Sequence, residues 1–299
     1  MKKIQFSSFI WIDINPDIQA DLDNLDNIIN LKDTTEQTLK SPIHLQRLEE
    51  YPDYMAVILH YPLYDKQLRK NQSVEIDCIL SQGYFVTSHK EHVHFIDSIM
   101  ANIEGKTSRF NSPVDLYIHL IEKMLSSCMT PLNRIAEKID FIEEEIFKGN
   151  EKNMISEISI VKRDVLDFRK TIRLHKSVIE SSIRLIPQYF PENQVKSKSI
   201  TDIISSNIHI WNITENLKEA IEAFDQTNQT LLSHKLNKNI KTLTTFSTTL
   251  APSTLFIGLL GINAKMDFLN NNLAFFIALI IALGISLTLY LYFRSRDVI

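Results

Sequence analysis

The spacing of apolar residues changes along the chain and separates it into regions of different structure. The first region contains runs rich in β-branched and aromatic residues, which predict β-strands. Between two of these runs, residues 17–30 repeat apolar positions on one helical face. A mixed α/β domain is therefore predicted over residues 1–115. The strand segments are 4–14, 54–64, 74–80 and 84–87.

The next region, residues 116–198, has apolar residues at helical spacing with dense charge between them. We expect two or three long helices here, forming a helical hairpin region that turns near Gly149 and Asn150.

A long stalk helix is predicted over residues 199–242, where apolar residues repeat every seven positions. This spacing is typical of a coiled-coil seam, and we interpret it as the contact that makes the protein an oligomer. No glycine or proline interrupts the pattern before Pro252, so one helix is expected from about residue 201 to 260. The seam consists of Ile203, Ile210, Leu217, Phe224 and Leu231.

Two apolar segments end the chain, at 243–260 and 273–293, joined by a loop at 261–272 and followed by a tail at 294–299. The second segment has 21 residues and no charge, which is long enough for a hydrocarbon core of ~30 Å. The first is also uncharged but carries seven hydroxyl side chains. We predict two transmembrane helices, and hence an α+β membrane protein whose stalk helix continues into the first span.

The first segment has a stripe of polar or small residues at steps of three and four, which lie on one face of a helix. Two interpretations are equally supported by this pattern. Small residues and hydroxyls can pack two membrane helices together, or the stripe can line a pore formed by several subunits. Ile240 and neighbouring Leu243 then form an apolar ring that can close by dewetting. The stripe comprises Asn237, Ile240, Thr244, Ser247, Ala251, Thr254, Gly258 and Gly261.

Composition and charge restrict the function. A net charge of −4 gives no indication of a nucleic-acid partner, and the two cysteines, Cys78 and Cys128, fit a reducing compartment. The N-terminal apolar run is interrupted too early for a signal peptide, and Lys and Arg flank the two spans on the side opposite the loop. We expect both termini in the cytoplasm. No phosphate-binding loop or nucleophile–base pair is present, so neither an enzyme nor a catalytic cofactor is expected.

Residues 233–263, SHKLNKNIKTLTTFSTTLAPSTLFIGLLGIN, resemble the pore helix and signature loop of the CorA-type divalent-cation transporters. That family ends its first span in Gly-Met-Asn after a Pro-x-Thr and a further Gly. Pro252, Thr254, Gly258, Gly261 and Asn263 stand at the matching positions. Here the middle signature residue is Ile262, which is closer to the ZntB branch, with its Gly-Val-Asn and its association with zinc.

The resemblance implies a funnel-shaped homopentamer in the inner membrane, with five long helices around the pore. Gly261, Ile262 and Asn263 would form the outer ring that selects the hydrated ion, and Asn237 would form a polar ring at the inner mouth. The first candidate ion is Mg²⁺, followed by Zn²⁺, Co²⁺ and Ni²⁺. A ZntB-like, proton-coupled zinc transporter is the alternative.

Asp202 matches an acidic residue at the regulatory Mg²⁺ site of the family, although the second acid expected there is Ser205 in this chain. Loss of one carboxylate weakens a site for a hard cation, and Asp202 near a helix start is also favourable with the helix dipole. Two other hypotheses are a membrane-anchored oligomeric scaffold or sensor, and a zinc site at His89, His92 and His94, which lacks the helical i, i+4 pair or the cysteines of common zinc sites.

Overall fold

The computed structural model divides into two compact units, residues 1–225 and 226–299. Helix α8 (Ser197–Ile262) contributes residues to both. The residues that the structure describes are 1–26, 28–29, 31, 35, 39–40, 44–65, 70–103, 110–193, 195–262 and 272–295.

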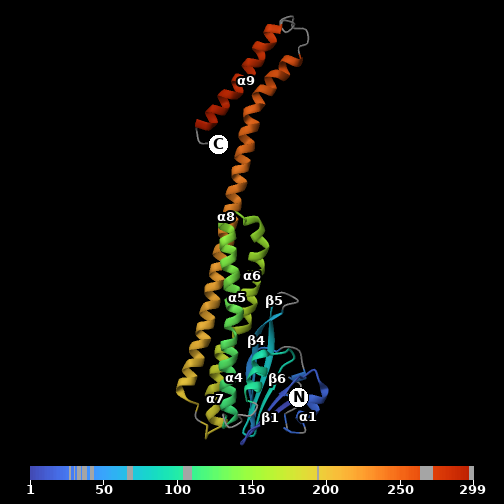
Figure 1. The fold of residues 1–299 in the computed structure, drawn as a ribbon, viewed down its shortest axis with the longest axis vertical. Coiled ribbons are helices and arrows are strands. Elements are labelled where there is room, and N and C mark those ends of the chain that lie inside the picture. The colour runs from blue at the N-terminus through green and yellow to red at the C-terminus, as the bar shows by residue number, and fades with distance from the viewer. Residues whose placement is uncertain are drawn as a thin grey trace. The chain divides into compact units, whose positions relative to one another are not determined.

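A six-stranded sheet forms the centre of the first unit (Figure 1). Its strand order is β1-β2-β6-β5-β4-β3. β2 and β6 pair in parallel, and the remaining neighbours are antiparallel. The α/β domain predicted from the sequence is confirmed. The strands are β1 (Lys2–Gln5), β2 (Ile10–Ile14), β3 (Arg47–Glu50), β4 (Tyr54–Asp65), β5 (Lys70–Ser81) and β6 (Tyr84–Ser88).

The predicted strand at 4–14 is in fact two strands, so that prediction was wrong in one respect. The chain turns around Ser7 and Ser8, where the amide of Phe6 donates to the carbonyl of Phe9 over 2.9 Å. β1 then pairs with β2 as a hairpin. Polar residues inside an apolar run mark such a turn. The predicted helix at 17–30 is present but shorter, as α1 (Gln19–Asp26).

Both faces of the sheet are covered, which explains why β2, β4 and β6 are rich in apolar residues. Trp11, Phe85 and Tyr117 are fully buried on one face. The ring centroid of Phe85 lies 6.1 Å from that of Trp11 and 6.4 Å from that of Tyr117. The opposite face contributes Ile14 to a core that includes Leu25 of α1. Tyr117 belongs to α4, so a helix covers the first face and α1 helps to cover the second.

Four helices, rather than the two or three predicted, follow α3 (His94–Ile103) in the described residues. The extra breaks contain neither glycine nor proline. At Cys128 the backbone keeps helical angles, and its amide still bonds to the carbonyls of Met124 and Leu125 at 3.3 and 3.1 Å. The predicted turn is confirmed, since Gly149 adopts φ 93°, which glycine tolerates best. The helices are α4 (Pro113–Ser127), α5 (Met129–Phe147), α6 (Glu151–Ile172) and α7 (His175–Tyr189).

Helix α8 confirms the prediction of one uninterrupted helix, with Pro252 inside it. Two of the five seam residues, Ile203 and Ile210, are only 1% and 3% exposed in the single chain and therefore pack within it. Leu217, Phe224 and Leu231 are half-buried, so a contact between subunits through this part of the seam stays a prediction. Salt bridges also connect α8 to α6. In one of them, Lys162 Nζ of α6 lies 2.7 Å from Asp225 Oδ2 of α8.

The buried imidazole of His175 makes the first unit sensitive to acid. Its Nε2 lies 2.6 Å from the carbonyl of His60, and burial lowers the pKa of His175 to about 4. The neutral ring is therefore the folded form. Below the unfolded pKa of about 6.5, only the unfolded chain takes up the proton, so stability is full above that pH and falls as the pH drops toward 4.

We predict that His175→Gln reduces the loss of stability between pH 7 and pH 4.5, by up to about 3 kcal/mol. Denaturation followed by tryptophan fluorescence reports on this unit alone, because both tryptophans, Trp11 and Trp211, lie in it. His94→Gln is the control, since His94 is exposed. An unchanged pH dependence in His175→Gln would refute the assignment.

Candidate ion pathway

The stripe predicted from the sequence lies on an open face of α8 in the single chain. Ile240 of the stripe and the neighbouring Leu243, which together form the predicted apolar ring, are 52% and 66% exposed. No hydrogen bond joins the described stripe side chains to α9. The other exposed members are Asn237, Thr244, Ser247, Ala251, Thr254 and Gly258.

A second set of hydroxyls lies on the opposite side of the same helix and contacts α9 (Asn272–Ser295). Thr245, Thr249 and Ser253 are spaced by four, about half a turn away from the stripe. Ser253 Oγ donates to the carbonyl of Ala282 at 2.7 Å and lies 2.5 Å from Ser286 Oγ. Ser286 Oγ in turn donates to the carbonyl of Thr249 at 3.1 Å.

These contacts show which side of the segment faces α9, and the use of the stripe as a pore lining stays a prediction. Ser253 and the backbone of Thr249 bond to α9, and the side chains of Thr245 and Thr249 on the same side are buried or half-buried. The stripe with Thr244 and Ser247 is exposed in the single chain.

In the described parts of the chain, we find no helix that combines the length and the apolar character needed to cross a membrane. The predicted spans at 243–260 and 273–293 lie within α8 and α9 but are not confirmed as spans. The hydroxyls of the first segment lower its hydropathy.

Two of the three signature residues belong to the end of α8. Gly261 and Ile262 are its last residues, and α9 begins at Asn272. Helix α8 therefore includes the first two residues of the connection predicted at 261–272, and α9 includes its last residue. Asn263 lies outside the described residues.

Asp202 lies at the edge of a cavity of about 450 Å³ in the first unit, together with Glu122 of α4 and His209 of α8. Burial, followed by the negative charge of Asp202, raises the pKa of Glu122. No pattern in the sequence indicates Glu122, because the two carboxylates are brought together only by the packing of α4 against α8. Ser126 and Ser206 complete the polar part of the lining.

Two of the three histidines considered as a zinc site, His89 and His92, contact different carboxylates. His89 Nε2 lies 3.2 Å from Asp13 Oδ1, and His92 Nε2 lies 2.8 Å from Asp97 Oδ2. Although burial alone lowers it, the bond to Asp13 raises the pKa of His89 overall. Across the described residues, no group of three or more His, Cys, Asp or Glu side chains is arranged to hold a metal ion.

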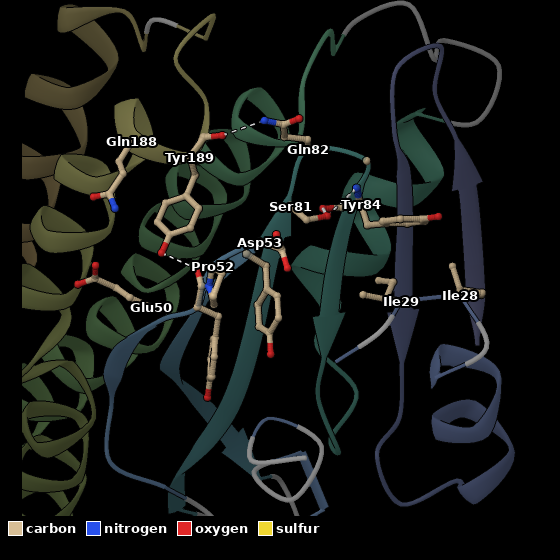
Figure 2. Close-up of a pocket in the computed structure, with 13 residues that line it drawn as sticks. Ile28, Ile29, Glu50, Pro52, Asp53, Ser81, Gln82, Tyr84, Gln188 and Tyr189 are labelled. Carbon is tan, nitrogen blue, oxygen red and sulfur yellow. Dashed lines mark hydrogen bonds between the residues drawn. The ribbon is translucent and has the colours of Figure 1, made fainter. Parts of the chain in front are cut away.

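Sequence reasoning also missed an open cleft of about 910 Å³ beside the sheet (Figure 2). Its walls are the turn before β4, the turn before β6 and the end of α7. The hydroxyl of Tyr189 points toward the first turn and donates to the carbonyl of Tyr51 at 2.8 Å. The Tyr51 ring stacks on Tyr54 at 4.6 Å. The hydrogen bond from Tyr189 therefore connects the end of α7 to the turn before β4.

The arrangement of an α/β domain, a helix shared by both units and a second long helix is also found in solved structures of other proteins. The complete structure of the CorA magnesium transporter from Methanocaldococcus jannaschii matches with a TM-score of 0.80 at 17% identity, covering 98% of this chain and 93% of that one. The ZntB cytoplasmic domain from Vibrio parahaemolyticus matches with a TM-score of 0.57 at 15% identity, covering 77% of this chain and 90% of that domain.

Sequence comparison gives the family. The model of the CorA-like Mg²⁺ transporter protein family matches residues 6–295, and the chain belongs to this family. The cobalt/magnesium transport protein CorA of Thermotoga maritima is 23% identical over 254 residues, which cover 84% of this chain and 72% of that protein. The resemblance inferred from the C-terminal signature is thereby confirmed, and the protein is a CorA-like divalent-cation transporter.

Proposed function

We propose that the protein is a homopentameric channel that conducts hydrated divalent cations, with Mg²⁺ first, across the inner membrane. The observation that carries this proposal is the division of α8 into two faces. One face is hydrogen-bonded to α9 through Ser253, while the stripe around Ser247 is open. Copies of the chain arranged around an axis can turn this open face inward.

The exposed apolar surface of α8 and α9 supports the same arrangement. Phe246 and Leu255 of α8 are 63% and 66% exposed, as is much of α9. Exposed apolar surface on this scale marks a contact with lipid or with other subunits. We propose that these side chains face the bilayer and neighbouring copies, with both termini in the cytoplasm.

In this proposal the ion is selected at the outer end of α8. Mg²⁺ gives up its water reluctantly, so carbonyl and amide oxygens of Gly261, Ile262 and Asn263 can hold it through the water shell. Neutral dipoles bind such an ion weakly enough for it to leave. We further propose that Ile262 packs outward and leaves the selecting carbonyls unchanged, so that Zn²⁺, Co²⁺ and Ni²⁺ remain secondary candidates.

A ZntB-like, proton-coupled zinc transporter is the alternative mechanism. The stripe from Ile240 to Gly258 contains no ionisable side chain. Proton relays inside membranes use such side chains, so this feature favours passive flow of the ion. A scaffold or sensor without transport is the remaining alternative, and it requires no open stripe.

Flux through the purified protein in liposomes tests the function. We predict Mg²⁺ influx that follows the membrane potential and does not change when a pH gradient is imposed. Asn263→Ala lowers the influx about tenfold, equivalent to about 1.4 kcal/mol of ion binding. Thr248→Ala, in an exposed residue of α8 outside the stripe, is the control. Zinc flux driven by the pH gradient would instead support the ZntB-like mechanism, and no flux of any ion would support the scaffold.

Two serines of α8 provide a matched test of the pore face. We predict that Ser247→Cys becomes accessible to a water-soluble, charged thiol reagent that then blocks flux, because Ser247 faces the water-filled passage. Ser253→Cys, which faces α9, remains unmodified. The native Cys78 and Cys128 are buried and give the background. Equal modification of both variants would show that the stripe does not line a passage.

We also propose that Asp202, with Glu122 beside it, contributes to a regulatory site for a divalent cation. Burial, followed by the negative charge of Asp202, raises the pKa of Glu122, and a bound cation would offset the repulsion between the two carboxylates. We predict that Asp202→Asn raises the Mg²⁺ concentration that half-inhibits flux about tenfold. The alternative, a favourable interaction of Asp202 with the helix dipole, leaves inhibition by Mg²⁺ unchanged.

A further inference from the structure

A small pocket of about 100 Å³ lies in the first unit, on the same face of the sheet as the core around α1. Asp77 of β5 and Ser88 of β6 stand directly opposite each other in the sheet, and both line the pocket. Their side chains are nearly inaccessible, with 7% and 1% exposure. Ser73, four residues before Asp77 on the same face of β5, lines it too. The pocket has room for water.

Three oxygen atoms of this pocket lack a hydrogen-bond partner within the described part of the chain. They are Asp77 Oδ1, Ser88 Oγ and Ser73 Oγ. A buried polar atom without a partner costs about 1–3 kcal/mol, and a charged one costs more. Native proteins rarely retain such atoms unless water, an ion or a ligand satisfies them. Three of them around one pocket indicate an occupant.

Negative charge predominates next to these atoms. Glu75 follows Ser73 on the same face of β5. Although burial alone raises it, bonds from His60 and His44 lower the pKa of Glu75, which keeps the carboxylate ionised. Burial, followed by the charge of Glu75, raises the pKa of Asp77 well above its ordinary value. Glu75 therefore places a carboxylate on the same face as these oxygen atoms, which favours a positively charged occupant.

The basic groups near the pocket already have other carboxylate partners. Lys90 Nζ lies 2.8 Å from Asp17 Oδ1, and Arg47 Nε lies 2.6 Å from Glu49 Oε1. They therefore do not neutralise Asp77 directly. The charged or titratable groups around the pocket are Arg47 and Glu49 of β3, His60 of β4, Glu75 of β5, and His44, His89, Lys90 and Glu91 of the connecting segments.

We propose that this pocket binds one hard divalent cation, for which Mg²⁺ is the representative, through Asp77 and the hydroxyls of Ser88 and Ser73, directly or through water. One or two carboxylates with hydroxyl and water oxygens are the ligands that such a cation prefers. Softer metals such as zinc favour sulfur and nitrogen ligands. No cysteine lines the pocket, and His89, which does line it, has its Nε2 3.2 Å from Asp13 Oδ1. The site is separate from the proposed passage, since all its residues belong to the first unit.

Binding of Mn²⁺, a paramagnetic substitute for Mg²⁺, tests this proposal in the full-length protein in detergent. Free Mn²⁺ is measured by electron paramagnetic resonance during titration. We predict that Asp77→Asn, which keeps the shape of the side chain, loses one Mn²⁺ per chain, and that Mg²⁺ displaces this ion from the native protein. Asp53→Asn, in an exposed turn of the same domain, retains the native number.

A second variant protects the test against failure of Asp77→Asn to fold. Ser88→Ala removes one hydroxyl from the pocket and is predicted to weaken the same Mn²⁺ site roughly tenfold. Native Mn²⁺ binding in both Asp77→Asn and Ser88→Ala would overturn the proposal and indicate a pocket that holds only water or a proton. Flux is not used as the measurement, so absence of this site and absence of transport are distinguishable.

Discussion

The hydrogen bonds between Ser253 and α9 determine how α8 is rotated about its own axis. A hydroxyl in apolar surroundings has few alternative partners, and here it contacts both the carbonyl of Ala282 and the hydroxyl of Ser286. Since these bonds hold one face of α8 against α9, the stripe around Ser247 must face away from it. The proposed passage thus depends on a contact made by residues that do not line it.

The buried carboxylates of the first unit can be compared by the partners that their oxygen atoms have. Asp164 is almost completely buried and binds Lys138 Nζ at 2.8 Å. Asp13 is 7% exposed and accepts a hydrogen bond of 2.6 Å from Thr87 Oγ1. Both carboxylates have a partner, as buried charges generally do. Oδ1 of Asp164 and Oδ1 of Asp77 both lack a hydrogen-bond partner in the described residues. The other oxygen of Asp164 binds Lys138, whereas Asp77 forms no salt bridge with a described residue and lines a pocket.

Much of the fold could be predicted from the sequence, because periodicity records which face of an element is buried. The strands at 54–64 and 84–87, the turn at Gly149 and the single helix α8 all follow from local patterns. The seam of α8 could not be assigned in the same way. A heptad repeat predicts that one face of a helix is buried, but it does not distinguish burial by another subunit from burial within the same chain. Ile203 is an example, since it packs within its own chain.

The same limit applies to the candidate site. The stripe was visible because its members share one helical face, whereas Glu122 and Asp202 are 80 positions apart in the sequence and meet only through helix packing. Asp77 and Ser88 are paired by the register of two strands. Alternation along a strand predicts which face a residue occupies, but the absence of a bonding partner depends on the whole surrounding structure.

Pro252 has a mechanical consequence for α8. Proline carries no amide hydrogen, so the carbonyl of Thr248, one turn earlier, receives no bond from it, and the helix is easiest to bend at this level. The hydroxyl of Ser286 donates to the carbonyl of the next residue, Thr249, and so stabilises this weakened turn through α9. Loss of that hydrogen bond would let the last ten residues of α8 change their direction relative to the rest of the helix.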